Sequence, residues 1–586
     1  MVLTAPFVLL DDARPGGAGA RLFRDPVDIV TATTPDAVPA ALARIREALA
    51  TGLHAAGFLA YGAGAAFEAR APASPHDPLL WFGLFEAAMP FDPATLPCAD
   101  GAWVGGAAPT VDFATYRQRL DAVLALIRAG DIYQANLTFP AKARVLGNPL
   151  AAYARLRGAS AAGWGAVVAT GQATHLSLSP EMFFTLDSGA LTARPMKGTA
   201  PRDPDPARDA AAARTLAADP KQRAENLMIV DLMRNDLSRV AMPGSVRVPA
   251  LFEVEHYPTV HQMTSTVTAV LAEGCDAIDV VSALFPCGSI TGAPKLRAMQ
   301  AIDAIEGQPR GLYTGAIGHF APGGDAAFNV AIRTLSLPAG GSEATLGLGS
   351  GIVADSRAAD EWAECLAKSA FLTAGARPFD LIETMRFDAR HGVLLLDRHL
   401  ERMRDSARLF GFTFDRHLAR NELQAATFRL RDDARVRLLL SRRGSMAIEI
   451  SPLPPPPDRP WRVAIVPLPV EGHDFRLRHK TSDRAFYDAA RRRTDCDEVL
   501  FADGEGFLTE GSFTNLFVAR EAGLLATPPA ARGLLSGVLR AELLATGRAY
   551  EIDLRADDLA GGFMLGNALR GLVSAVTVAA PRQGGL

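Results

Sequence analysis

The stretch HLSLSPEMFFTLDSGALTARPMKGT, residues 175–199, is the most informative part of the chain. It begins with a strand that ends near Glu181 and leads into a turn, where Lys197 directly precedes Gly198. Such a turn presents one amine from a rigid base, and a partly desolvated lysine can lose its proton and act as a nucleophile. Taken alone, a lysine in a turn is more often an ordinary surface residue, so the neighbouring stretches must decide.

The composition is that of a large globular protein. The 586 residues allow three or four compact units, and the 49% hydrophobic content is enough for sizeable cores. A net charge of -4 without long runs of one sign argues against a nucleic-acid surface. The five scattered cysteines include no CxxC pair, which argues against a disulfide framework or a zinc site. Because the N-terminus lacks a basic region and no apolar run reaches the ~18 residues of a membrane span, we expect a cytoplasmic protein that does not bind a membrane.

Periodicity predicts the elements around Lys197. Apolar residues recur at helical spacing over residues 112–129, and DIYQANLTFPAKARV, residues 131–145, has the pattern of a strand. The polar stretch over residues 201–219 is expected to be exposed. A long helix is then predicted to begin near Lys221.

Several carboxylates stand in apolar contexts and could hold a cation. Glu181 follows Ser-Pro at a strand end, and Glu225 opens an apolar helix. Glu361, Glu364 and Lys368 are spaced i, i+3 and i+7, which places them on one helical face. Converging carboxylates suit magnesium, which takes oxygen ligands and usually shares them with an anionic substrate. Spacing alone favours a solvated salt-bridge face for the second group.

A glycine-rich region follows. GSITGAPKLRAM, residues 288–299, is predicted to be a loop that runs into a helix, and glycines at 347, 349 and 351 interrupt a strand. Glycines let a backbone approach a ligand closely and leave N–H groups free for an anion. Arg333 is a charge inside an apolar strand. It is either a paired core arginine or a clamp for a substrate carboxylate.

Ten of these stretches together resemble the chorismate-utilising enzymes. In the family's order, from about residue 105 to 370, they are GDIYQANL, SPEMF, RPMKGT, RAENLMIVDLMRNDLSRV, YPTVHQMTSTV, FPCGSITGAPKLRAM, GLYTGAIGHF, FNVAIRT, GLGSGIVADS and EWAECLAKSA. The resemblance implies an α+β fold for residues 1–375, with two layered antiparallel sheets, outer helices and a site in the cleft between the sheets.

The resemblance also implies roles for individual residues. Family members that make aminodeoxychorismate carry lysine at the position of Lys197, whereas anthranilate synthases carry alanine. Lysine would attack C2 of chorismate and expel the C4 hydroxyl, after which ammonia attacks C4. Isochorismate synthases also have a site lysine, which activates water, so hydration is a weaker alternative. Glu181 would be the acid/base near the leaving hydroxyl. Glu225 and Glu364 would hold Mg²⁺, with Glu361 close by. The expected substrate contacts are His261, Thr291, Gly292, Tyr313, Arg333, Gly349, Ser350 and Lys368.

No glutaminase is visible, because none of the cysteines stands in a Gly-x-Cys-x-Gly elbow. We therefore expect free ammonia or ammonia from a separate glutamine amidotransferase subunit.

A new domain is predicted for residues 376–586. After the Gly/Ala/Pro boundary at 373–378, a strand, a helix from about Asp397 and a hairpin follow. Lys480 in RHKTSDR and Glu510 in EGSFTNLF suit pyridoxal 5'-phosphate (PLP), because a lysine attaches the cofactor and a carboxylate keeps its pyridine nitrogen protonated. Gly537 would begin a helix whose N–H groups form a phosphate site.

Residues 379–580 resemble the class IV, branched-chain-type PLP enzymes. The matching segments are HLERM, HKTSDR, EGSFTNLF and GNALRGLVSA. One departure is that Gly537-Val538-Leu539-Arg540 lacks the threonine of the usual pattern, which removes one phosphate contact. A homodimer through this domain is one expected assembly. The resemblance implies cofactor contacts from Arg402, Lys480, Glu510, Ser512, Asn515, Gly537, Val538, Leu539, Asn567 and Ala568.

The fusion of the two domains suggests the function. A first domain that makes aminodeoxychorismate would supply a class IV lyase that releases pyruvate and 4-aminobenzoate, a step of folate synthesis. Two alternatives remain open for the second domain: an amino-acid transaminase, or a degenerate module that binds a glutaminase subunit or dimerises. Lys480 and Glu510 argue against the degenerate module, whereas the missing threonine favours it.

Overall fold

The structure is a computed structural model that describes residues 3–68, 71, 78–257 and 260–579. The chain divides into two compact units. The first comprises Met1–Ala99, Val104–Val145 and Pro149–Gly375; the second comprises Asp100–Trp103, Leu146–Asn148 and Ala376–Leu586. Pro258 and Thr259 of the YPTVHQMTSTV motif lie outside the described residues. Within the described ranges no helix combines the length and the apolar character needed to cross a membrane.

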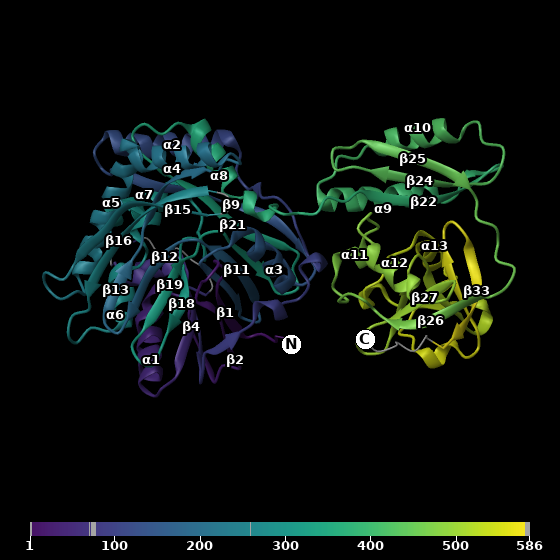
Figure 1. The fold of residues 1–586 in the computed structure, drawn as a ribbon, viewed down its shortest axis with the longest axis horizontal. Helices are drawn as coiled ribbons and strands as arrows, with labels where there is room; N and C mark the ends of the chain where they lie inside the picture. Colours follow the sequence, from purple (N-terminus) through teal and green to yellow (C-terminus); the bar gives the residue numbers. More distant parts are fainter. Residues whose placement is uncertain (1–2, 69–70, 72–77, 258–259, 580–586) are drawn as a thin grey trace. The chain divides into compact units, whose positions relative to one another are not determined.

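The first unit is built on two large sheets, as predicted (Figure 1). The first, 11-stranded sheet has the order β17 (Gly292–Ala293), β9 (Gln134–Leu146), β21 (Glu343–Ile352), β20 (Thr334–Pro338), β11 (Ala173–Ser179), β10 (Trp164–Ala169), β1 (Phe7–Asp12), β2 (Gly19–Arg24) and β6 (Met89–Phe91), with β7 (Trp103–Val104) and β8 (Ala108–Pro109) off this path. The second, 10-stranded sheet has the order β14 (Met196–Pro201), β16 (Val260–Val270), β13 (Ala190–Ala193), β12 (Met182–Asp187), β19 (Ala326–Val330), β18 (Ala316–Phe320), β4 (His54–Leu59), β5 (Leu80–Phe85) and β3 (Asp28–Ala32), with β15 (Arg247–His256) pairing β16.

Buried apolar side chains hold the layers together. One core cluster joins β1 and β2 of the first sheet to β4, β5 and β18 of the second, with Phe23, Phe58 and Phe85 among its fully buried members. A larger cluster packs α1, α5 and α6 against the second sheet. The helices of this unit are α1 (Val38–Ala50), α2 (Phe113–Arg128), α3 (Pro149–Ser160), α4 (Pro206–Ala218), α5 (Pro220–Ser238), α6 (Ala277–Leu284), α7 (Lys295–Glu306) and α8 (Ala358–Ala367).

Capping residues explain where the predicted helices begin. The Asp112 side chain accepts a hydrogen bond of 2.8 Å from the backbone N–H of Thr115, which caps α2. Asp219 caps α5 in the same way, with Pro220 in the first helical turn, where a missing N–H is tolerated. Both helices confirm the sequence predictions. The polar stretch before α5 was predicted only to be exposed, and it forms the additional helix α4, capped by Asp205.

The structure extends one prediction about the stretch over residues 175–199 and contradicts another. The strand expected to end near Glu181 is β11, and after Pro180 and Glu181 a further strand, β12, belongs to the other sheet. Pro180 cannot donate a ladder hydrogen bond, so a break there is expected. Lys197 lies on strand β14 and not in a turn; the register of β14 shifts between Met196 and Thr199, where Gly198 has φ +94.

The second unit contains two sheets of its own. A 4-stranded antiparallel sheet, β23 (Gly392–Val393), β22 (Leu381–Asp388), β24 (Ala434–Leu440) and β25 (Met446–Pro452), packs with α9 (Leu396–Phe410) and α10 (Arg416–Thr427). An 8-stranded mixed sheet has the order β28 (Leu508–Gly511), β27 (Glu498–Ala502), β26 (Trp461–Pro467), β33 (Gly571–Val578), β32 (Phe563–Asn567), β29 (Asn515–Ala519), β30 (Leu525–Thr527) and β31 (Ala549–Glu551). The remaining helices are α11 (Phe475–Arg478), α12 (Ala485–Arg492) and α13 (Val538–Ala545).

Two glycines with opposite surroundings test the packing of the first unit. A Cβ on Gly57, in β4, would lie 2.0 Å from the carbonyl oxygen of Trp81, whereas a Cβ on the exposed Gly158 of α3 would meet no atom within 4 Å. We expect Gly57→Ala to lower the free energy of unfolding by about 2 kcal/mol or more, because backbone must move. Gly158→Ala should raise it by about 0.5–1 kcal/mol through helix propensity. Denaturant unfolding of both variants checks this, and equal effects would contradict the packing described.

Candidate active sites

Lys197 lies where the two sheets of the first unit come close together. A Cβ on Gly351 of β21 would be 2.9 Å from Lys197 Nζ and 3.5 Å from the side-chain nitrogen of Gln134. The lysine on β14 of one sheet therefore reaches β9 and β21 of the other. Gly351 is required here because a side chain would occupy the space beside the amine.

The surroundings of Lys197 favour its neutral form. Burial lowers the pKa of the Lys197 amine, and the ammonium of Lys368 lowers it further. The carboxylates of Glu225, Glu181 and Glu364 oppose this effect without reversing it. A lysine with a lowered pKa has an available lone pair and can act as a nucleophile.

The pKa of Glu181 is shifted in the opposite direction to that of Lys197. Burial raises the pKa of this carboxyl to about 7, and the hydrogen bond that Ser289 Oγ donates to it, at 2.7 Å, only partly opposes the rise. The break between β11 and β12 places Glu181 at the crossing from one sheet to the other. Ser289 belongs to the glycine-rich loop of residues 288–290, and sequence reasoning did not single it out. A carboxyl group with such a pKa can donate a proton near neutral pH.

The three proposed metal ligands are linked through Glu225, which lies within electrostatic range of the other two. Burial raises the pKa of Glu225, and the carboxylates of Glu361 and Glu364 raise it further. Glu361 accepts a hydrogen bond of 2.6 Å from Ser356, and Glu364 pairs with Lys368 at 2.7 Å. Among the described residues, no three His, Cys, Asp or Glu side chains are arranged as a formed metal site. The oxygen donors and their mutual repulsion nevertheless fit a hard cation such as Mg²⁺.

Arg333 and Tyr313 have the surroundings expected of substrate contacts. Burial lowers the pKa of Arg333, and the described part of the chain supplies no carboxylate partner for its guanidinium. This favours the carboxylate clamp over the paired core arginine. The Tyr313 ring lies against Gly347, where a Cβ would be 2.0 Å from a ring carbon, and burial raises the pKa of the Tyr313 hydroxyl. Lys368 donates a hydrogen bond of 2.9 Å to the carbonyl of Gly349.

Two of the remaining predicted substrate contacts, His261 and Ser350, have side chains that other protein groups already engage. Both ring nitrogens of His261 are engaged, one by Asp209 at 2.8 Å and one by His256 at 2.7 Å, so a direct substrate contact by His261 is not supported. The Ser350 hydroxyl lies 3.4 Å from Tyr116 of α2, on the face of β21 opposite the glycines, and its side chain does not point into the cleft.

The loop that carries Thr291 is also internally bonded. The Thr291 hydroxyl donates to the carbonyls of Cys287 and Gly288, both at 3.2 Å. Gly292, with φ +150, pairs with Ala135 of β9, and a Cβ there would lie 2.2 Å from the carbonyl oxygen of Gln134. Thr291 and Gly292 therefore bring the loop against β9; a contact of these residues with substrate remains a prediction.

A buried ion pair fixes the loop, the helix and the strand together. Arg310 and Glu306 are 2.8 Å apart with side chains only 2% and 3% exposed. Arg310 also donates to the carbonyls of Asn136 at 2.6 Å and Ile290 at 3.0 Å, and Glu306 accepts from the backbone N–H of Thr138 at 2.7 Å.

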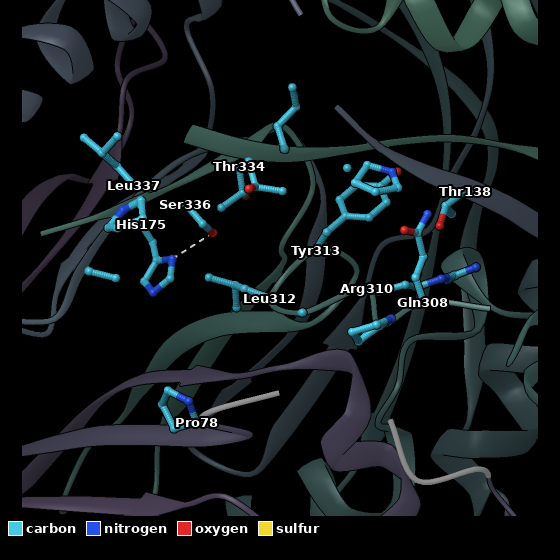
Figure 2. Close-up of a pocket in the computed structure, with 18 of the residues that line it drawn as sticks. Pro78, Thr138, His175, Gln308, Arg310, Leu312, Tyr313, Thr334, Ser336 and Leu337 are labelled. Carbon is cyan, nitrogen blue, oxygen red and sulfur yellow. Dashed lines mark hydrogen bonds between the residues drawn. The ribbon is translucent and has the colours of Figure 1, made fainter. Parts of the chain in front are cut away.

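A cavity of about 380 Å³ adjoins this ion pair (Figure 2). Tyr313, Thr138 and Arg310 line one part of it, and His175, hydrogen-bonded to Ser336 at 2.9 Å, lines another. Lys197 and Glu181 are not among its lining residues. This cavity is therefore distinct from the space beside Lys197 and Glu181.

Lys480 is the centre of a second cluster of charges in the second unit. Burial lowers the pKa of its amine to about 7, and the guanidinium groups of Arg484 and Arg402 contribute. The backbone carbonyl of Lys480 accepts a hydrogen bond of 3.0 Å from Ile382, which ties the lysine to strand β22. The residue follows the short helix α11.

Glu510 is held by two donors that sequence reasoning missed. The Tyr487 hydroxyl donates to Glu510 Oε1 at 2.5 Å, and the backbone N–H of Leu535 donates to Oε2 at 3.1 Å. Burial raises the pKa of Glu510 to about 7, which these hydrogen bonds and the charge of Arg484 oppose. A carboxylate oriented in this way fits the pyridine nitrogen of PLP.

Arg402 is oriented by a buried carboxylate. Its guanidinium donates two hydrogen bonds to Glu383, at 2.8 and 2.6 Å, and His399 contacts the same carboxylate at 2.6 Å. Although burial raises it, the charges of Arg402 and His399 lower the pKa of Glu383 to about 2. Arg402 also donates to the carbonyl of Ser536, beside the start of α13. A cation next to a helix N-terminus fits a phosphate group.

The other predicted cofactor contacts form hydrogen bonds mainly with other protein groups around Lys480, Glu510 and Arg402. Ser512 donates to the buried Glu498 at 2.6 Å, and the amide of Asn515 donates to the carbonyl of Leu535 at 2.9 Å. Gly537 caps α13 as predicted, followed by Val538 and Leu539, and a Cβ on Gly537 would lie 1.9 Å from Asn515 Oδ1. Asn567 organises the loop that contains Ala568 by accepting from the N–H groups of Leu569 and Arg570.

Comparison with known proteins gives two family matches. Residues 99–374 match the model of the chorismate binding enzymes, and residues 380–578 match that of the class IV amino-transferases. Over 253 residues, 43% of this chain and 56% of the relative, the chain is 46% identical to "Aminodeoxychorismate synthase component 1" of Klebsiella aerogenes. Over 266 residues, 45% of this chain and 52% of the relative, it is 40% identical to "Anthranilate synthase component 1" of Streptomyces coelicolor.

A solved structure supports the fold of the first unit. Anthranilate synthase component I from Streptococcus pneumoniae has a TM-score of 0.53 and 25% identity, over 64% of this chain and 93% of that one. The chain spans about half the length of the curated relatives it matches.

The raised pKa of Glu181 predicts a pH-dependent effect on stability. Between pH 4.5 and about 7 the folded protein holds a proton that the unfolded chain releases, so this residue lowers the free energy of unfolding as pH rises through that window. Glu181→Gln should therefore stabilise the protein at pH 8 by about 1–3 kcal/mol and have little effect at pH 4.5. Thermal unfolding at both pH values tests this against Glu343→Gln, an exposed control. The same shift at both pH values would contradict a buried, protonated Glu181.

Proposed function

Because the chain carries a chorismate binding enzyme region at residues 99–374 and a class IV amino-transferase region at residues 380–578, we propose that it converts chorismate to 4-aminobenzoate in two steps. The first unit would form 4-amino-4-deoxychorismate, and the second would release pyruvate from it. The observation that carries the first step is the buried amine of Lys197, whose pKa burial lowers, close to the buried carboxyl of Glu181, whose pKa burial raises to about 7.

In the first step Lys197 would attack C2 of chorismate while the C4 hydroxyl leaves. Glu181 would donate the proton that the hydroxyl needs to leave as water. Ammonia would then attack C4 and form the C4–N bond, the double bond would move back, and the bond between C2 and Lys197 would break. Arg333 would bind a substrate carboxylate. Glu225, Glu361 and Glu364 would hold Mg²⁺, which would neutralise carboxylate charge on the substrate.

The lysine determines which product forms. Without a nucleophilic lysine, ammonia itself would attack C2 and lead to anthranilate. If Lys197 activated water instead, isochorismate would form. The similarity to relatives named aminodeoxychorismate synthase supports amination at C4. Since that relative is named as a component, we further propose that a separate amidotransferase subunit supplies the ammonia.

In the second step bound PLP would act as an electron sink for the carbon that carries the amine. Lys480, with a pKa near 7, would remove the proton from that ring carbon, pyruvate would leave and the ring would become aromatic. Glu510 would contact the pyridine nitrogen, with Tyr487 fixing its orientation. Arg402 and the start of α13 would bind the phosphate. An amino-acid transaminase remains the alternative for this unit, because the family match covers transaminases.

Product analysis of the purified protein tests both steps. We expect 4-aminobenzoate and pyruvate from chorismate, Mg²⁺, ammonium and PLP, identified by chromatography with mass detection. If aminodeoxychorismate is the only product, the second unit is not a lyase. Assays with amino-acid donors and 2-oxo acids would then test it for transamination. Anthranilate or isochorismate would overturn the role of Lys197.

The Lys197→Ala variant tests the nucleophile. We expect aminodeoxychorismate formation to fall by more than about 1000-fold, or the product to change to anthranilate, because the amine that blocks C2 is gone. Lys142→Ala, which removes an exposed lysine on β9, is the control and should be unaffected. An unchanged rate and product in Lys197→Ala would disprove covalent participation.

The Lys480→Ala variant tests cofactor attachment without measuring turnover. The wild-type protein with PLP should be yellow, and the visible absorption of the attached cofactor should disappear in the variant. Lys142→Ala again serves as the control. A colourless wild-type protein that takes up no added PLP would count against a functional second unit.

A further inference from the structure

Gln134, at the start of β9, is a fully buried amide with no hydrogen-bond partner for its side chain. It is 0% exposed, and within the described ranges neither its side-chain nitrogen nor its oxygen is hydrogen-bonded. An unsatisfied buried polar group destabilises a folded protein, so most buried polar groups are hydrogen-bonded, and an amide with both side-chain atoms unpaired calls for an explanation. The buried amide of Asn329, by contrast, is engaged: its oxygen accepts from the N–H of Ile317 at 3.0 Å and its nitrogen donates to the carbonyl of Trp164 at 2.8 Å.

The side chain of Gln134 points into the cleft beside Lys197. Its nitrogen and Lys197 Nζ both border the space that Gly351 leaves open, at 3.5 and 2.9 Å from the position of the missing Cβ. The backbone of Gln134 cannot shift to find partners elsewhere, because β9 is paired with β17 on one side and β21 on the other. Any group that enters the cleft at Gly351 therefore meets the amide and the amine together.

We propose that Gln134 is a substrate-binding residue whose amide N–H donates to a carboxylate oxygen of the substrate while its carbonyl accepts from the Lys197 amine. This inference rests on the proposed function. The amide supplies one donor and one acceptor, which matches an anion and a neutral amine. Being uncharged, it orients Lys197 without stabilising the ammonium form, whereas a carboxylate at the same position would raise the pKa of the lysine.

Binding of chorismate to the Gln134→Leu variant tests the proposal. Thermal unfolding of the full chain would be measured with and without chorismate and Mg²⁺, in the absence of ammonia. The ligand-free variant should be as stable as the wild type or more stable, because an unsatisfied polar group has been removed. Chorismate should stabilise it much less than the wild type, and its KM should rise about tenfold or more. Equal stabilisation by chorismate in both proteins would overturn the proposal.

The Asn329→Leu variant is the matched control for a buried amide with a purely structural role. It should lower the unfolding temperature, because its hydrogen-bond partners are left unpaired, and it should leave the KM for chorismate unchanged. If Gln134→Leu behaves like Asn329→Leu, then Gln134 is structural and the proposal is wrong. If chorismate fails to stabilise even the wild type, the proposed function of the first unit is wrong instead.

The Gln134→Glu variant tests the interaction with the lysine separately. The added carboxylate should favour the ammonium form of Lys197, so the ascending limb of kcat against pH for chorismate amination should move to higher pH by about one unit. Turnover at the new optimum should recover in part. An unchanged pH profile would show that the side chain at position 134 does not reach the Lys197 amine.

Discussion

The ion pair between Arg310 and Glu306 is the contact on which the first site depends. Burying two charges is unfavourable unless every lone pair and N–H group is used, and here the surplus hydrogen bonds go to the backbone of Asn136, Thr138 and Ile290. These contacts join β9, the glycine-rich loop and the end of α7. Since β9 carries Gln134 and the loop carries Ser289, one neutralised pair sets the positions of groups that face both Lys197 and Glu181.

The two units use desolvation in the same way on unrelated folds. In each, burial lowers the pKa of a lysine and raises that of a glutamate to about 7, which brings the two groups closer in proton affinity than they are in water. The hydrogen-bond donors to the two glutamates differ. Glu181 receives a serine hydroxyl, whereas Glu510 receives a tyrosine hydroxyl and a backbone N–H. The arginine at each site also differs: Arg402 is neutralised by Glu383, and Arg333 has no such partner among the described residues.

The family resemblance implied the layered sheets, and the sequence itself predicted helices α2 and α5 and singled out the two central lysines, because periodicity and motif order are local signals. It did not identify Ser289, Glu383 or Tyr487, whose roles depend on contacts across 108, 19 and 23 positions of the chain. It could not show how the side chains of Ser350 and His261 are engaged, because the alternation of β21 and the position of Asp209 decide where those side chains point. Gln134 was quoted within a motif, but only its burial without partners makes it a candidate.

The two desolvated lysines belong to a chain that contains very few lysines. The 60 basic residues include only six lysines, at positions 142, 197, 221, 295, 368 and 480. Lys221, Lys295 and Lys368 are engaged with carboxylates, and an ammonium held in this way is a poor nucleophile. An electrophile such as an aldehyde therefore encounters few reactive amines apart from Lys197 and Lys480. Arginine provides the remaining positive charge without competing for the cofactor, so the composition of the surface itself protects the selectivity of both sites.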